Sequence, residues 1–204
     1  MKRKLCSSRV HVFLVLFVFL IYVALPLLIL AGVIPFNLKF YALTLGAIVV
    51  YGVLRVCHFS NEEIGIKSIG WFESIKHVFP ISVLLALLGL LLWALGLSRI
   101  TPNETWYFFI FYIFVSSPIQ EFLYRGALNG ILEKFEVSEP VRMVLTSLLY
   151  SFVHIIYKDL LTLLLTFGIG LIWFRCYRKT KNLLGVSISH AILGVVTIVG
   201  GFIN

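Results

Sequence analysis

The stretch VHVFLVLFVFLIYVALPLLIL, from Val10 to Leu30, decides the fold of this chain. It contains no Asp, Glu, Lys or Arg and has the length of about 20 apolar residues that an α-helix needs to cross a bilayer. The basic residues Lys2, Arg3, Lys4 and Arg9 precede it, as in a signal peptide, but the apolar run exceeds the roughly 7 to 15 residues of a typical signal sequence. We therefore expect an uncleaved first transmembrane helix.

The rest of the chain repeats this pattern. Of its 204 residues, 60% are hydrophobic and only 13% are charged, far from the usage of a soluble domain. Further apolar runs cover residues 40–56, 80–97, 106–125, 142–157, 160–174 and 183–203. The predicted fold is all-α, a polytopic membrane helix bundle of about seven transmembrane helices, with a kink expected at Pro118.

One interfacial amphipathic helix is expected between the second and third runs. Apolar residues recur there at helical spacing among charged ones, a pattern typical of a helix lying in the plane of the membrane surface. They are Ile64, Trp71, Phe72, Ile75 and Val78.

The formal net charge is +8, and the basic residues that give it lie between the apolar runs and form no single stripe. Their positions therefore indicate the membrane topology. We expect no nucleic-acid partner. A cytoplasmic amino terminus places almost all Lys and Arg residues inside and only Lys39, Arg99 and Lys158 outside, with the carboxyl terminus outside. The predicted location is a bacterial inner (plasma) membrane, with the endoplasmic reticulum as the alternative.

Four polar side chains lie deep in the predicted spans: Glu121, Arg125, His154 and His190. Such residues are expensive in a bilayer and usually serve a function. Glu121 and Arg125 are four residues apart and share one helix face, so a structural ion pair also explains them. The ordinary explanation for His154 is a hydrogen-bonded core residue, and for His190 it is an interfacial residue. Together, however, a carboxylate and two histidines on three spans can activate water and stabilise an oxyanion.

About the last hundred residues resemble the CPBP intramembrane proteases, also called the Abi or type II CAAX prenyl endopeptidase family. The family motif of paired glutamates, three residues, arginine and glycine is matched by Gln120-Glu121-Phe122-Leu123-Tyr124-Arg125-Gly126. An aromatic residue, three further residues and a histidine are matched by Tyr150 to His154. The final histidine is matched by His190. We divide the single membrane domain into amino-terminal helices with the interfacial helix, 1–100, and a protease core, 101–204.

The resemblance implies an intramembrane endopeptidase, a hydrolase that cleaves a membrane-associated or lipidated peptide within or near the cytoplasmic half of the bilayer. In the family the first glutamate and the second-motif histidine activate water, and the last histidine and an asparagine bind the oxyanion. Here Gln120 and Gly194 replace that glutamate and asparagine. The predicted catalytic residues are therefore Glu121 as base, His154 sharing its water, Arg125 tuning the pKa of Glu121, His190 at the oxyanion, and Gln120 orienting water or donating to the oxyanion.

Three alternatives stay open. Family members have been described as metal-dependent metalloendopeptidases, so Glu121, His154 and His190 are the candidate ligands for zinc, although no cofactor is favoured because HExxH is absent. The losses at Gln120 and Gly194 favour a catalytically silent relative that binds a peptide or partner, for instance in bacteriocin self-immunity. A transporter is the third, and the absence of an internal repeat argues against it.

Overall fold

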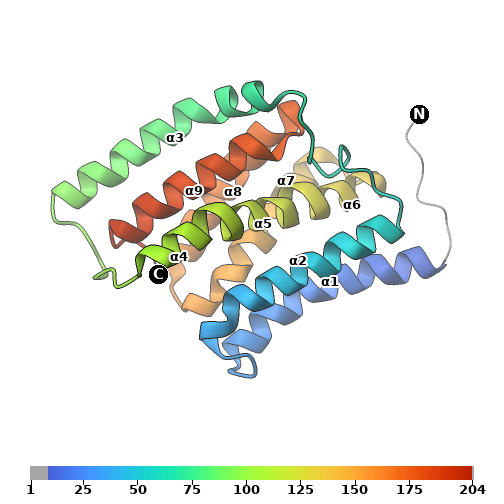
Figure 1. Ribbon diagram of the computed structural model, residues 1–204, viewed down its shortest axis with the longest axis horizontal. Helices are drawn as coiled ribbons and strands as arrows, with labels where there is room; N and C mark the ends of the chain where they lie inside the picture. Colours follow the sequence, from blue (N-terminus) through green and yellow to red (C-terminus); the bar gives the residue numbers. More distant parts are fainter. Residues whose placement is uncertain (1–8, 204) are drawn as a thin grey trace.

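The computed structural model describes residues 9–203, which form helices and contain no strand (Figure 1). The elements in chain order are α1 (Arg9–Leu30), η1 (Phe36–Leu38), α2 (Lys39–Val56), α3 (Trp71–Ala94), α4 (Trp106–Phe111), η2 (Tyr112–Ser116), α5 (Ser117–Glu121), η3 (Phe122–Leu128), α6 (Asn129–Lys134), α7 (Glu139–Phe152), η4 (Val153–Tyr157), α8 (Leu160–Thr180) and α9 (Leu183–Val199). Six continuous helical stretches are long and apolar enough to span a membrane, and α9 is a shorter apolar helix. The predicted all-α bundle of about seven membrane helices is confirmed. The protein is an integral membrane protein.

The predicted interfacial helix is not formed as a separate element, although Trp71, Phe72, Ile75 and Val78 lie in the first turns of α3. Residues 61–70 are turns and loop, and Trp71 begins a helix that continues through Pro80 to Ala94. Two glycines with positive φ, Gly65 (80°) and Gly70 (78°), end any helix before Trp71. The loop also packs inward, because Ile64 is fully buried and the side-chain amide of Asn182 donates to the carbonyl oxygens of Lys67 (2.8 Å) and Ile69 (3.1 Å).

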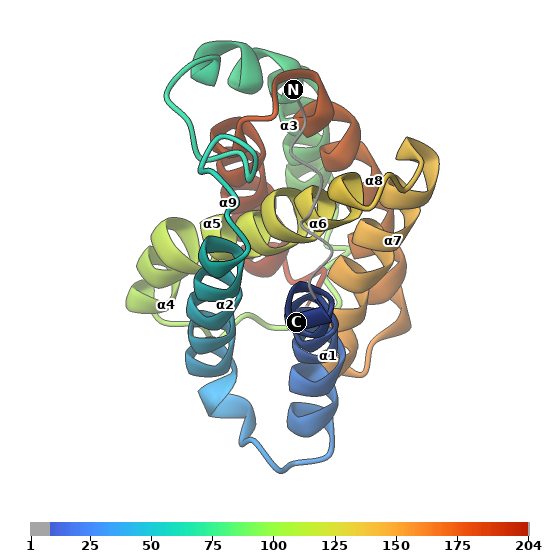
Figure 2. The ribbon, with the colours of Figure 1, turned by 90° about the vertical axis from the view of Figure 1, so that its right-hand side faces the viewer.

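The stretch from Trp106 to Lys134 runs through the middle of the bundle (Figure 2). The α3–α9 pair packs on one side of it and the α1–α2 pair on the other, while α7 packs against α8. Residues 112–116 and 122–128 of this stretch are wound as π-helix, on either side of α5. Pro118, expected to kink this span, directly follows the first π segment, and wide turns of this kind occur often at functional sites.

The backbones of α3 and α9 approach closely. A Cβ added at Gly185 lies 2.2 Å from the carbonyl oxygen of Ser74, and Ser82 Oγ donates to Ser189 Oγ at 2.7 Å across the same interface. Small residues at a membrane helix contact allow the backbones to approach, and the approach strengthens dispersion forces and hydrogen bonds that water does not weaken.

The two ends of the bundle differ in charge. The basic end comprises residues 55–70, 134–139 and 175–183, where Lys134 pairs with Glu63 (3.4 Å), Lys181 with Glu133 (2.6 Å) and Arg178 with Glu139. The Asp159 end comprises residues 30–39, 95–106, 157–160 and 199–203. The helix order therefore places alternate connections at opposite ends, as the positive-inside argument requires. Residues 1–8, which carry Lys2, Arg3 and Lys4, lie outside the described residues.

Asp159 joins three segments at its end of the bundle. Its carboxylate accepts two hydrogen bonds of 3.0 Å from the Arg99 guanidinium, and it caps α8 by accepting from the Thr162 backbone N–H (3.1 Å). Arg99 also donates to the Phe202 carbonyl (3.0 Å). The Arg99 guanidinium, followed by the Thr162 hydroxyl, holds the pKa of Asp159 well below its usual range. This clamp positions the loop between α3 and α4.

Because α3 and α9 approach closely at Gly185, we predict that adding one methyl group there strongly affects stability. We expect Gly185→Ala to lower the free energy of unfolding by about 1–3 kcal/mol, because the new Cβ meets backbone atoms that cannot rotate away. Gly52→Ala is the matched control, since nothing lies within 4 Å of its added Cβ. Thermal unfolding of the detergent-solubilised variants measures both, and equal midpoints would show that the two helices are not in close contact.

Candidate active site

Glu121, Arg125 and His190 form a buried charged cluster where α5, η3 and α9 meet. Glu121 and Arg125 have no exposed surface, and His190 is 2% exposed. Arg125 Nη1 donates to Glu121 Oε1 at 3.3 Å, and His190 Nδ1 contacts the same oxygen at 2.8 Å. Arg125 Nε lies 3.3 Å from Glu121 Oε2, within ion-pair distance but without hydrogen-bond geometry. The only carboxylate expected inside the membrane is thus bound on both sides.

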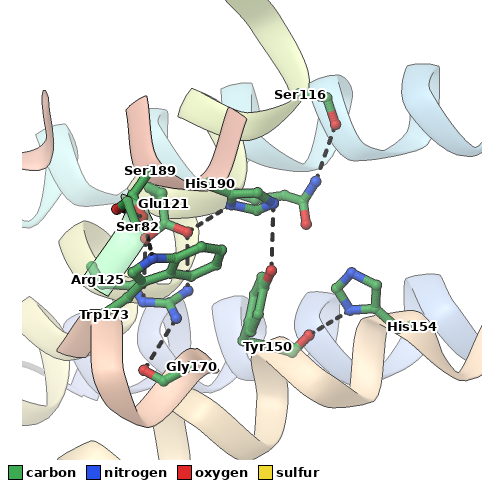
Figure 3. A network of polar contacts seen from close by, with 11 residues as sticks. Ser82, Ser116, Glu121, Arg125, Tyr150, His154, Gly170, Trp173, Ser189 and His190 are labelled. Atoms are coloured by element: carbon green, nitrogen blue, oxygen red, sulfur yellow. Dashed lines mark hydrogen bonds and ion pairs between the residues drawn. The ribbon is translucent and has the colours of Figure 1, made fainter. Parts of the chain in front are cut away.

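Aromatic rings enclose this cluster (Figure 3). The Arg125 guanidinium carbon lies 4.4 Å from the centroid of the Tyr150 ring, and Trp173 stacks on His190 with centroids 4.7 Å apart. Trp173 Nε1 donates to Ser189 Oγ at 2.8 Å, and Arg125 Nη2 donates to the Gly170 carbonyl at 3.3 Å. Each nitrogen of Arg125 therefore faces an oxygen or lies beside a π face, which is how a bilayer protein tolerates a buried guanidinium.

His154 and Gln120 form a second group, which lines a cavity of about 80 Å³ between α1, α2, η3 and η4. His154 Nδ1 lies 2.9 Å from the Tyr150 carbonyl oxygen. A carbonyl only accepts, so Nδ1 carries the proton and Nε2 keeps its lone pair in the neutral ring. Gln120 Nε2 donates to Ser116 Oγ at 3.1 Å, which leaves its second N–H unassigned.

No hydrogen bond or ion pair joins Glu121 and His154, which the sequence predicted to share one water. Successive residues of an α-helix point about 100° apart, so Gln120 and Glu121 face different neighbours. Gln120 faces the cavity with His154, whereas the partners of Glu121 are Arg125 and His190. The expectation that the two adjacent positions can exchange roles did not take account of His190, which lies on another helix and binds Glu121.

His190 also differs from its predicted position at an oxyanion. Its Nδ1 contacts the Glu121 carboxylate, so this nitrogen carries a proton, and its Nε2 lies 3.4 Å from the Tyr150 hydroxyl. Both ring nitrogens therefore face protein partners, and His190 is absent from the cavity wall. Tyr150 lies between the two groups, with its hydroxyl toward His190 and its carbonyl toward His154 (Figure 3).

The space left by Gly194 is filled by Tyr112. A Cβ at Gly194 falls 1.9 Å from the Tyr112 hydroxyl oxygen and 2.5 Å from its ring, and the ring lies edge to face with His190 at 6.0 Å. Sequence reasoning missed Tyr112 and Trp173 because aromatic residues are common in membrane helices. Tyr150 was visible as the aromatic residue of the second motif, but its hydrogen bonds were not.

The predicted zinc ligands do not fit a metal site. No group of three His, Cys, Asp or Glu residues able to hold a metal occurs in residues 9–203. The Glu121 carboxylate is already bound by Arg125 and His190, so it is not available to join His154 around a metal ion.

Comparison with protein families matches residues 102–196 to the family described as type II CAAX prenyl endopeptidase Rce1-like. The resemblance seen in the motifs is confirmed, and the match contains both groups of polar residues. No curated protein and no solved structure matches the chain. The Rce1-like family supports a protease of the CAAX type at the level of the family.

Because Glu121 and Arg125 form a buried ion pair, we predict a large effect on stability when one of the two charges is removed. We expect Glu121→Gln to lower the free energy of unfolding by about 3–5 kcal/mol, because it leaves the Arg125 guanidinium buried without its counterion. The double variant Glu121→Gln with Arg125→Met removes both charges and keeps an acceptor for His190, so its stability should return most of the way. Thermal unfolding in detergent measures both, and equal midpoints for the single and double variants would contradict the ion pair.

Because Tyr112 fills the space beside Gly194, we predict that a larger residue at position 194 is tolerated only when Tyr112 is also replaced. We expect Gly194→Ala to be destabilising by about 1–3 kcal/mol and a second change, Tyr112→Ala, to remove the clash, so that the two effects are not additive. Gly168→Ala, on α8 with nothing within 4 Å of the new Cβ, is the control. Additive effects in a double-mutant cycle of unfolding midpoints would show that Tyr112 does not fill this space.

Proposed function

We propose that this protein is an intramembrane endopeptidase that hydrolyses a peptide bond of a membrane-associated or lipidated peptide, and that His154 activates the water. The observation that carries the proposal is the hydrogen bond of His154 Nδ1 to the Tyr150 carbonyl, which leaves Nε2 as a base in the cavity that Gln120 also lines. A positioned histidine is the commonest general base in enzymes.

In this proposal the water oxygen attacks the scissile carbonyl carbon while its proton passes to His154 Nε2. The carbonyl oxygen becomes an oxyanion, and the unassigned N–H of Gln120 donates to it. When the C–N bond breaks, the imidazolium returns the proton to the leaving amine. Of the two roles predicted for Gln120 from the sequence, orienting water and donating to the oxyanion, this mechanism uses the second. His154 acts without a carboxylate partner.

The charged cluster acts through Tyr150 rather than on the substrate. Arg125 lies over the Tyr150 ring, and His190 contacts its hydroxyl, so the cluster fixes the residue whose carbonyl orients His154. We propose that Glu121, Arg125 and His190 are positioning residues. Positioning matters because general base catalysis requires hydrogen-bond distance between base and water.

The walls and the volume of the cavity limit which part of a substrate can bind in it. Its walls are mainly apolar, from Tyr22, Leu25 and Leu43 among others. A volume of about 80 Å³ is well below the roughly 300–1,000 Å³ of a pocket for a small molecule. The cavity therefore accepts a short stretch of peptide or one side chain, and a lipid group of the substrate would lie outside it in the bilayer.

A catalytically silent binding protein is the second candidate. It is favoured by one observation, that no carboxylate lines the cavity: Gln120 stands there, and Glu121 is sequestered by Arg125 and His190. The same cavity would then hold a peptide without hydrolysing it.

Cleavage of a membrane-tethered peptide library by the purified protein tests the proposal. We expect His154→Ala to lower the rate by about 10²–10⁴-fold, the usual contribution of general acid–base catalysis, at unchanged folding. His77→Ala, at the start of α3 and outside the cavity, is the matched control and should cleave like the parent. The double variant Glu121→Gln with Arg125→Met, if it folds, should cleave more slowly than the parent but faster than His154→Ala, because the cluster acts on His154 only through Tyr150.

Three outcomes decide between the candidates. A folded double variant that cleaves no better than His154→Ala would contradict a role of the cluster in positioning alone. Cleavage seen only after Gln120→Glu, which adds a carboxylate beside His154, would identify a silent binding protein. No cleavage by the parent or by Gln120→Glu would refute the proposed hydrolysis.

A further inference from the structure

The connection between α3 and α4, residues 100–104, forms one wall of a second cavity, at the Asp159 end of the bundle. This cavity has a volume of about 340 Å³. Its other walls come from the start of α2 and from the ends of η4 and α9. Neither His154 nor Gln120 lines it, so the proposed hydrolysis gives it no role.

The second cavity lies at the level of the lipid headgroups. Helices α2 and α4 begin beside it, and α9 ends there. Trp106 and Tyr107, the first residues of α4, follow the connection directly and are exposed. Exposed Trp and Tyr at the ends of membrane helices mark the interface between hydrocarbon and water. The headgroup of a bilayer lipid can therefore reach this cavity.

Two opposite charges line this cavity without pairing. Lys39 and Glu104 are both in its wall, and within residues 9–203 neither side chain forms an ion pair or a hydrogen bond with another residue. Glu104 is nevertheless close enough to act electrostatically on Lys39. The cavity thus offers one cationic and one anionic side chain to a ligand.

Aromatic rings hold the Lys39 ammonium group beside the cavity. Its Nζ lies 3.8 Å from the ring centroid of Phe36 and 5.0 Å from that of Tyr157, and both rings line the cavity. Contact with a π face stabilises the cation but supplies no lone pair, so its N–H donors remain available to an anionic oxygen. A phosphate group would accept these hydrogen bonds.

The two charges together restrict the class of ligand. Glu104 would repel a simple anion bound at Lys39, and an apolar ligand would leave both charges unpaired. A ligand that carries a phosphate and an ammonium group neutralises both. The volume is at the lower end of the roughly 300–1,000 Å³ of ligand pockets, which suits a headgroup without its acyl chains.

We infer that this cavity binds a phosphoethanolamine headgroup, with the phosphate at Lys39 and the ammonium group at Glu104, and that a bilayer phospholipid supplies it. Ile198 and Ile203 add apolar wall, beside which the glycerol carbons can lie. Phosphocholine fits less well because its quaternary ammonium has no N–H to donate to Glu104. The inference does not depend on the proposed hydrolysis.

Native mass spectrometry of the purified full chain in detergent measures which lipids it retains. From mixtures of equal amounts with the same acyl chains, we expect phosphatidylethanolamine to be retained about tenfold more than phosphatidylcholine, because one charge-assisted hydrogen bond is worth at least that factor. Phosphatidylglycerol, which has the phosphate but no ammonium group, should also be retained about tenfold less. Equal retention of the three lipids by the parent would overturn the site, and that result needs no variant.

Single variants locate the headgroup. Glu104→Gln should abolish the preference for phosphatidylethanolamine over phosphatidylcholine, and Lys39→Met should lower the retention of both lipids by about tenfold. Glu62→Gln and Lys158→Met are the matched controls, because both residues are exposed and lie outside the cavity. Unfolding midpoints without added lipid show whether each variant is folded.

Two further outcomes test the assignment. A preference for phosphatidylethanolamine that persists in both folded variants, Glu104→Gln and Lys39→Met, would place the headgroup elsewhere and overturn the inference. Soluble O-phosphoethanolamine separates the two sources of the same chemistry. If it fails to displace the lipid at equal concentration, the lipid is supported as the source, whereas full displacement would overturn the lipid and assign the cavity to a free phosphate ester.

Discussion

The ion pair between Glu121 and Arg125 constrains the whole bundle, because two charges without water are stable only where other helices supply their remaining contacts. Arg125 needs the carbonyl of Gly170 and the faces of Tyr150 and Trp173 as well as its counterion. Glu121 needs His190 on α9. Satisfying one residue pair therefore brings α5, η3, α7, α8 and α9 to one point, and desolvation makes any looser arrangement costly.

Tyr150 connects this structural centre to the cavity. Its ring and hydroxyl belong to the charged cluster, and its carbonyl holds His154 in one tautomer. A change in the cluster therefore reaches His154 through a single residue. This link explains how polar residues that do not contact a substrate can still be needed for the proposed chemistry, and why loss of activity in a variant of the cluster does not by itself identify a catalytic residue.

Close approaches of helices set the remaining geometry. Gly185 lets α9 contact the backbone of α3, and Gly194 leaves room for Tyr112 beside His190. Each glycine is needed for its missing side chain rather than for backbone freedom, since both lie within a regular helix. Gln120 and Glu121 lie in α5, between two π-helical segments, and Gln120 faces the cavity whereas Glu121 faces the cluster.

The sequence by itself determined that the chain is an all-α membrane bundle, because the length and apolar character of each run leave no other way to satisfy the backbone in lipid. Its motifs also determined the resemblance to this family of proteases, and the Rce1-like match over residues 102–196 agrees with it. The tertiary structure alone decided which polar residues meet. Spacing along one helix predicts the contact of Glu121 with Arg125, but His190 and His154 lie on other helices, and packing at Tyr150 assigned one to the cluster and the other to the cavity. The prediction of a separate interfacial helix was wrong for the same reason. The apolar residues do recur at helical spacing, but Ile64 and its loop are buried against the core, and periodicity in the sequence does not predict that contact.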